Sequence, residues 1–176
     1  MTTPDVARLF LALWPDDAVR ARLAAYRDAW RWPAGAKPVA DEKLHLTLHF
    51  IGAFARDRIA ALGEALAEVE IEPLRLCAGS AEIWRGGIAV LSVAPAPALS
   101  ALHARLGAAL ADVGIALEVR PFAPHVTLAR KARGAESPGD AAEIEWTARA
   151  PVLVESMRVP PSTYRVLFEV GSIEPT

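Results

Sequence analysis

Two short motifs in this chain share a sequence pattern that could carry chemistry. The sequence reads His-Leu-Thr-Leu at residues 45–48 and His-Val-Thr-Leu at residues 125–128, so the two copies lie 80 residues apart. In a strand, side chains two positions apart lie on the same face. His45 and Thr47 would therefore share one face, and His125 and Thr127 would share the equivalent face of a second strand. The pattern predicts two equivalent strands that supply polar groups to one site.

Paired imidazoles suit general acid–base catalysis. The unperturbed pKa of histidine is near 6.5, so one ring can accept a proton while its partner donates one. A threonine hydroxyl two positions later can hydrogen-bond the same ligand. Two histidines and two hydroxyls around one anionic centre fit an in-line displacement at phosphorus, because proton transfer is needed at the attacking and leaving oxygens.

Other interpretations of these histidines stay open from the sequence. One His-x-Thr on its own is typical of an ordinary polar strand face, and His45 and His49 could together bind zinc. The chain has no His-Glu-x-x-His motif and only one cysteine, Cys77, and no acidic ligand pattern lies nearby. His49 has no counterpart in the second motif, where Ala129 stands, so it could line the mouth of a cleft or face solvent. His103 is expected on the surface of a helix or partly buried there.

The charge and composition exclude several classes of protein. The net charge is −2, with 19 basic and 21 acidic residues dispersed along the chain. No basic stripe is present, so we expect no binding to long duplex nucleic acid, although a small anionic ligand remains possible. No apolar run approaches the roughly 18–20 residues of a membrane span. The first residues do not resemble a signal peptide and the single cysteine cannot form an internal disulfide, so we expect a cytoplasmic protein.

The elements that must position the motifs form a mixed α+β pattern. Helical spacing of apolar residues predicts helices over 16–30, 57–69 and 98–113. Strands are predicted over 7–13, 45–50, 74–80, 81–84, 88–93, 116–130, 150–159 and 164–170. A helix precedes each motif, which indicates two related halves within one domain over residues 1–176.

The residues around both motifs resemble a known family. The segments HLTLHFIG at 45–52 and PFAPHVTLAR at 121–130 resemble the paired signatures of the two-histidine (2H) phosphoesterase superfamily. They are most similar to the bacterial RNA 2′,3′-cyclic phosphodiesterases, also called 2′-5′ RNA ligase-like proteins. The segments RLFLALWPDD at 8–17 and YRVLFEV at 164–170 occur in the family's order. The resemblance implies a bilobal α+β fold, in which two pseudo-symmetric antiparallel sheets flanked by helices enclose a central cleft.

The resemblance also implies an activity and a set of site residues. It implies hydrolysis of 2′,3′-cyclic phosphates, on RNA 3′ ends or small nucleotides, to 2′-phosphates without a metal or other cofactor. It assigns catalysis to His45 and His125 and phosphate contacts to Thr47, Thr127 and Arg130. Simple alternation would turn Arg130 away from His125, because it lies five positions further on. We predict His125 as the general base and His45 as the general acid, although the symmetry of the motifs does not itself distinguish them.

Two other functions remain possible on the same fold. One is 2′-5′ RNA ligation on cleaved tRNA halves, which is the reverse reaction, and the other is a non-catalytic RNA- or nucleotide-binding module. A zinc hydrolase is a further alternative. We expect a monomer, and we expect four aromatic residues to belong to the core and not to a base-stacking surface: Phe10, Phe54, Trp84 and Phe122.

Overall fold

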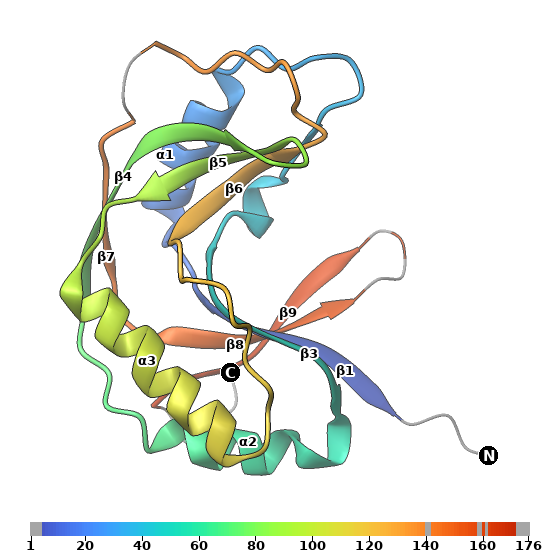
Figure 1. The fold of residues 1–176 in the computed structure, drawn as a ribbon, viewed down its shortest axis with the longest axis vertical. Coiled ribbons are helices and arrows are strands. Elements are labelled where there is room, and N and C mark those ends of the chain that lie inside the picture. The colour runs from blue at the N-terminus through green and yellow to red at the C-terminus, as the bar shows by residue number, and fades with distance from the viewer. Residues whose placement is uncertain (1–4, 140–141, 158–159, 161, 172–176) are drawn as a thin grey trace.

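The computed structural model describes residues 5–139, 142–157, 160 and 162–171, and its elements follow an α+β order (Figure 1). The helices are α1 (Asp17–Asp28), α2 (Ile59–Ala67) and α3 (Pro97–Asp112), with two short 3-10 turns at Asp41–Lys43 and Arg56–Arg58. The strands are β1 (Val6–Leu13), β2 (Lys37–Pro38), β3 (Leu46–Ala55), β4 (Leu74–Trp84), β5 (Ile88–Val93), β6 (His125–Arg130), β7 (Ile144–Ala148), β8 (Pro151–Met157) and β9 (Thr163–Glu169).

The strands form one antiparallel sheet in the order β7-β4-β5-β6-β3-β1-β8-β9, with β2 paired to β6. Within the described residues, β3 and β6 are joined by one residue pair in register, Leu46 opposite Val126. The two sheets expected from the sequence are therefore two halves of one continuous sheet. The halves meet at the two His-x-Thr motifs, and this arrangement confirms the predicted α+β class.

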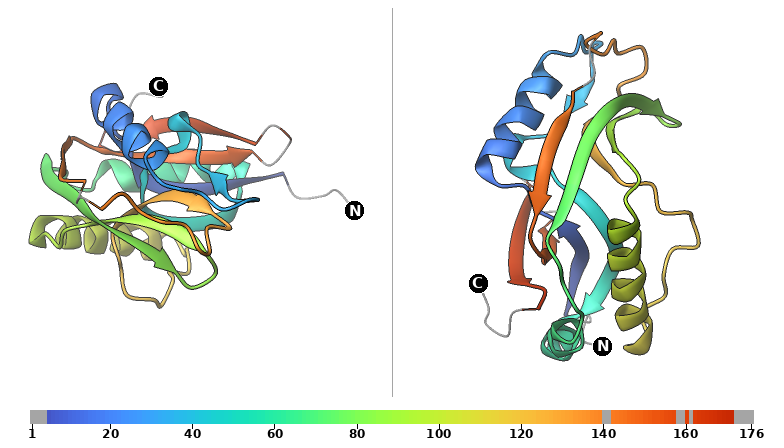
Figure 2. Two further views of the ribbon diagram at one scale, coloured as in Figure 1. Left: turned by 90° about the horizontal axis from the view of Figure 1, so that it is seen from above. Right: turned by 90° about the vertical axis from the view of Figure 1, so that its left-hand side faces the viewer.

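Helices pack against both halves of the sheet, and their buried residues belong to one hydrophobic core. Helix α1 packs against β7, whereas α3 packs against β3 and against α2 (Figures 1 and 2). The core between them is largely leucine, including Leu11 of β1 and Leu106 of α3, both completely buried. Burial of these side chains fixes the strands that carry the motifs. Among the described helices, none is long and apolar enough to cross a membrane.

Several strand predictions were wrong in their extent, and the strand predicted at 45–50 is observed as Leu46–Ala55. Residues 74–80 and 81–84 form the single strand β4, which continues past a shift in register between Ala78 and Ser80. Residues 116–124 form no strand, because Pro121 and Pro124 lack the N–H that a central strand requires. Strand β7 was not predicted, although its residues alternate between buried and exposed. The predicted strand at 150–159 is observed as Pro151–Met157, and residues 158–159 lie outside the described residues.

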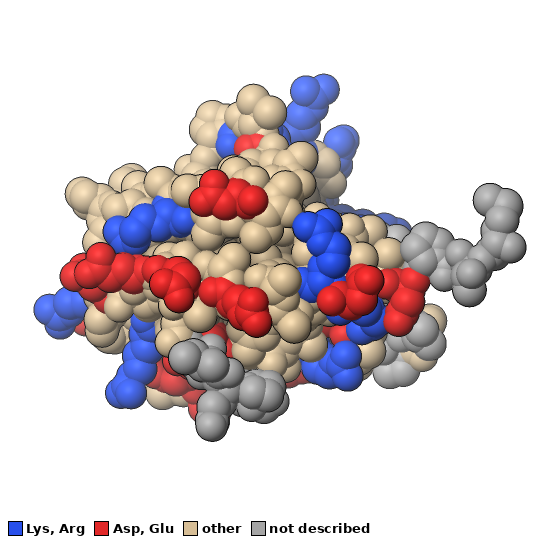
Figure 3. All heavy atoms as spheres, turned by 90° about the horizontal axis from the view of Figure 1, so that it is seen from below, with Lys and Arg blue, Asp and Glu red and all other residues tan. Residues whose placement is uncertain are grey.

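Charged side chains of both signs lie close together on the face shown in Figure 3. Lysines and arginines are interspersed there with aspartates and glutamates. This face therefore carries no continuous basic stripe of the kind that a long duplex would require.

Candidate active site

The pairing of β3 with β6 brings the two motifs together. Leu46 and Val126, the second residues of the two motifs, lie opposite each other in antiparallel register. Extending this register by one residue in each direction places the histidine of each motif opposite the threonine of the other. Alternation then puts both histidines and both threonines on one face of the sheet. The one residue pair between β3 and β6 thus has the register that the predicted two-fold arrangement requires.

Hydrogen bonds orient the imidazole of His45. Its Nδ1 lies 2.7 Å from the carbonyl oxygen of Lys43. Because a carbonyl only accepts, Nδ1 carries the proton of the neutral ring. Its Nε2 lies 3.0 Å from Oγ1 of Thr47, so the threonine hydroxyl can donate to it. The Nε2 atom of His45 is therefore the atom available for proton transfer.

Three aromatic rings enclose His45. The indole of Trp14 stacks on the imidazole at 5.2 Å with an interplanar angle of 9°. Tyr164 lies edge-on at 5.5 Å, and Phe10 lies at 5.1 Å. The pKa of His45 is lowered to about 4. Burial among these rings is the largest cause, the Lys43 carbonyl opposes it, and the positive charges of His125 and Arg130 act in the same direction as burial.

His125 is held in the same way in the other half. Its Nδ1 lies 2.7 Å from the carbonyl oxygen of Ala123, which again leaves Nε2 for proton transfer. The ring of Trp84 lies 4.3 Å from the imidazole, at 58°. Burial lowers the pKa of His125, and the charge of Arg130 adds to this effect. The Ala123 carbonyl and the carboxylate of Glu82 act in the opposite direction.

A β-bulge returns Arg130 to the face of the histidines. Thr127 pairs with Val90 and Ala129 pairs with Ala89, so Leu128 is an extra residue in β6. One extra residue reverses the alternation after it, and Arg130 therefore lies on the same face as Thr127. The positive charge of Arg130 contributes to the lowered pKa of both His45 and His125. The expectation from simple alternation that Arg130 faces away was wrong.

The equivalent bulge in β3 removes His49 from that face. Thr47 pairs with Ala12 of β1 and His49 pairs with Leu11, so Leu48 is an extra residue in β3. His49 therefore points to the opposite side of the sheet, where it is only 8% exposed. Its Nε2 lies 2.8 Å from the carbonyl oxygen of His103 on α3, and the two imidazoles stack at 3.9 Å. The alternative that His49 faces solvent was therefore wrong.

The bulge in β3 also exposes an aromatic residue that sequence reasoning missed. Phe50 is 50% exposed and stands in the first motif where Arg130 stands in the second. It lines a cleft of about 420 Å³ that His125 and Thr47 also line, whereas His45 is not among its lining residues. Trp84 and Phe122 line this cleft too. Phe122 also packs against the core as expected, whereas Trp84 does not belong to the core, and Phe10 and Phe54 are buried as expected. The full lining is Thr47, Leu48, His49, Phe50, Trp84, His103, Glu118, Arg120, Pro121, Phe122, Ala123 and His125.

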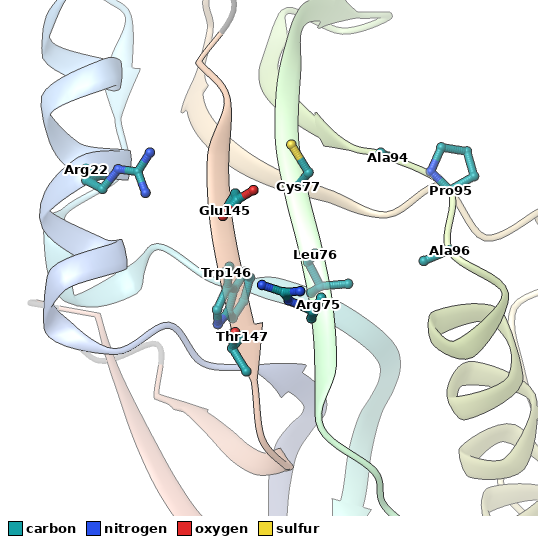
Figure 4. A pocket seen from close by; sticks show the side chains of 10 residues that line it. All are labelled: Arg22, Arg75, Leu76, Cys77, Ala94, Pro95, Ala96, Glu145, Trp146 and Thr147. Atoms are coloured by element: carbon teal, nitrogen blue, oxygen red, sulfur yellow. The ribbon is translucent and has the colours of Figure 1, made fainter.

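Another hollow lies at the edge formed by β4 and β7, away from the motifs. It has a volume of about 530 Å³ and includes Arg75, Cys77 and Glu145 (Figure 4). None of the ten residues that line it belongs to either His-x-Thr motif.

The described residues offer no metal site at the motifs. His45 and His49 lie on opposite faces of the sheet and cannot share one ion. Across the part of the chain that the structure describes, no three histidine, cysteine, aspartate or glutamate residues are grouped so that they could hold a metal.

Comparison with known proteins identifies relatives over nearly the whole chain. A protein from Thermus thermophilus named RNA 2′,3′-cyclic phosphodiesterase is 30% identical over 94% of this chain and 90% of its own length. A protein of the same name from Escherichia coli is 31% identical over 71% of this chain and 72% of its own length. A third, from Archaeoglobus fulgidus, is 33% identical, but the match spans only 39% of each chain.

Solved structures share the fold. A crystal structure described as a phosphoesterase superposes with a TM-score of 0.84 at 25% identity, covering 94% of this chain and 97% of the other. The crystal structure of E. coli LigT complexed with 3′-AMP gives a TM-score of 0.83 at 25% identity, with the same coverage. A family model described as the 2'-5' RNA ligase superfamily matches residues 15–163. Since this match spans most of the sequence, the chain belongs to the 2'-5' RNA ligase superfamily.

Proposed function

We propose that this protein hydrolyses 2′,3′-cyclic phosphates on RNA 3′ ends or small nucleotides to 2′-phosphates, with His45 and His125 as the acid–base pair. The observation that carries the proposal is the meeting of both His-x-Thr motifs on one sheet face, through the pairing of β3 with β6. The names of the Thermus and E. coli relatives support the same reaction class.

The proposed reaction is an in-line displacement. His125 takes a proton from water at Nε2 while the water oxygen bonds to phosphorus. The bond between phosphorus and O3′ breaks, and O3′ receives the proton that His45 carries at Nε2. The hydroxyls of Thr47 and Thr127 and the guanidinium of Arg130 hold the non-bridging oxygens, where negative charge accumulates in the transition state.

The acid role requires that the substrate raise the pKa of His45. In the ligand-free protein burial holds this pKa at about 4, so the ring is neutral near pH 7. An anionic phosphate beside the ring favours its charged form. Substrate binding therefore favours protonation of His45. The protonated ring is then available to donate its proton to the leaving oxygen, and it forms only when substrate is bound.

The cleft is large enough for a nucleotide or a chain end. Its volume of about 420 Å³ is in the range of small-molecule sites. Phe50 from β3 and Trp84 from β4 flank it and offer ring faces to a ribose or a base. Nucleotides are bound in structures of a relative, because E. coli LigT has been crystallised with 3′-AMP, ATP and NADP+.

The direct test is hydrolysis of a 2′,3′-cyclic nucleotide in the presence of a chelator. Phosphorus NMR distinguishes the 2′- from the 3′-phosphate in the product. We expect turnover that the chelator does not change and a 2′-phosphate product. A 3′-phosphate would reverse the assignment of the leaving oxygen, and binding without turnover would indicate a non-catalytic module.

The description of the family favours 2′-5′ ligation as a second candidate. Ligation uses the same groups in reverse, with a ribose hydroxyl in place of water. Water at about 55 M competes with that hydroxyl unless the site excludes it, and the cleft is open to solvent. Hydrolysis is therefore the leading proposal, and incubation with cleaved tRNA halves would measure the ratio of joined to hydrolysed ends.

A further inference from the structure

The carboxylate of Glu82 on β4 is held in place close to His125. Ser92 Oγ donates a hydrogen bond of 2.6 Å to Oε1, and Trp84 Nε1 donates one of 3.1 Å to Oε2. Both donors also adjoin the histidine, because Ser92 lies directly opposite His125 in the sheet and the Trp84 ring lies 4.3 Å from the imidazole. Two hydrogen bonds from different strands therefore fix both oxygens of this acid on the face of the proposed site.

Glu82 is the negative charge among the groups that act on His125. Arg130, on the same strand, is the positive charge that acts on the ring. Glu118 and Arg120 line the same cleft but pair with each other, at 2.9 Å. The charges that act on His45 are both positive, so the two histidines of this symmetric site have different electrostatic environments.

We propose that Glu82 is a positioning residue for His125: held by Ser92 and Trp84, it stabilises the positive charge that His125 acquires on taking a proton from water. The proposal rests on the proposed hydrolytic function. The carboxylate does not touch the imidazole, whose Nδ1 is engaged by the carbonyl of Ala123. Its effect is electrostatic and acts through space, because an opposite charge nearby favours the protonated imidazole.

The expected effect is modest because Glu82 is exposed. Water screens a surface charge, and exposed charge pairs change an equilibrium by about two- to fivefold. Replacing Glu82 by glutamine keeps the shape of the side chain, since the amide can accept from Trp84 and donate to Ser92. The substitution therefore removes the charge and leaves the packing in place.

The test is an NMR titration of the His125 imidazole in the wild-type protein and in Glu82→Gln. We expect the His125 titration to move to lower pH in Glu82→Gln, because an attractive charge is lost. Glu145→Gln is the matched control, since Glu145 is an exposed acid of β7 that is not among the groups acting on His125. In kinetics at pH 7, Glu82→Gln should lower kcat about two- to fivefold with little change in KM, and Glu82→Asp should recover part of the loss.

Two results would overturn the proposal. One is a His125 titration that is unchanged or moves upward in Glu82→Gln, and the other is an equal shift in Glu145→Gln. The titration does not depend on turnover. If the wild-type protein hydrolysed no cyclic phosphate, the proposed function would fail while the titration still decided whether Glu82 acts on His125.

Discussion

Replacing Trp14 by alanine should raise the pKa of His45. The indole stacks on the imidazole at 5.2 Å and 9°, and burial is the largest cause of the lowered pKa. Without the indole, water reaches one face of the ring and solvates the protonated form. Phe10 and Tyr164 stay in contact with the other sides, so the recovery should be partial.

The difference between the ordinary pKa of histidine and the pKa of His45 sets the upper limit of this rise. The pKa of His45 falls from 6.5 to about 4, and about 1.4 kcal/mol per pH unit makes the cost of charging the ring about 3 kcal/mol. At pH 7, only about one His45 ring in a thousand would be protonated in the ligand-free protein. In Trp14→Ala, we expect the pKa to lie between about 4 and 6.5, so the protonated fraction at pH 7 rises.

The assay is an NMR titration of the histidine rings in Trp14→Ala and in a matched control. Trp32→Ala is the control, because Trp32 is also half-buried and stacks on another ring, that of Trp30, at 4.9 Å and 3°. Urea denaturation of both variants would show that each remains folded at the pH values used.

A His45 titration that stays near pH 4 in Trp14→Ala would refute the reasoning. In that case burial by the indole would not be what disfavours the charged ring. An equal rise in Trp32→Ala would refute it as well, since that substitution leaves the surroundings of His45 intact.

Three other perturbations have expected outcomes. Arg130→Gln should weaken binding of inorganic phosphate about 10- to 150-fold in calorimetry, because a hydrogen bond to a charged group is lost; unchanged affinity would remove Arg130 from the site. Phe50→Ala should raise KM for a cyclic nucleotide at least about fivefold at constant kcat, since stacking contributes equally to ground and transition states; a fall in kcat alone would contradict this. The folded protein should lose stability as the pH falls from about 6.5 towards 4. The pKa values of His45 and His103 are about 4 in the folded protein, so the unfolded chain binds more protons than the folded protein over this pH range. Urea denaturation at pH 7 and pH 5 tests this, and an equal or higher free energy of unfolding at pH 5 would contradict it.

The sequence was sufficient to predict the meeting of the motifs. Two copies of His-x-Thr on apolar strands imply equivalent positions in a pseudo-symmetric sheet, and the pairing of Leu46 with Val126 has the register that this symmetry requires. The order of helices and strands followed largely from the spacing of apolar residues and from proline and glycine.

Alternation within one strand could not predict what lies beyond each motif. Leu48 and Leu128 are extra residues relative to β1 and β5, so the bulges depend on partner strands that are distant in sequence. They bring Phe50 and Arg130 onto the face of the histidines and turn His49 away. The hydrogen bonds of Glu82 likewise depend on the register between β4, β5 and β6, which no local pattern specifies.

The most direct test of the central claim is the single-turnover rate on a 2′,3′-cyclic nucleotide of His45→Ala, His125→Ala and the double variant. General acid–base catalysis contributes about 10²–10⁴-fold, so each single variant should lose about that much. Because the two rings act in one step, the double variant should be far less impaired than the product of the single losses. If both single variants kept nearly the wild-type rate, the paired-histidine mechanism would be wrong.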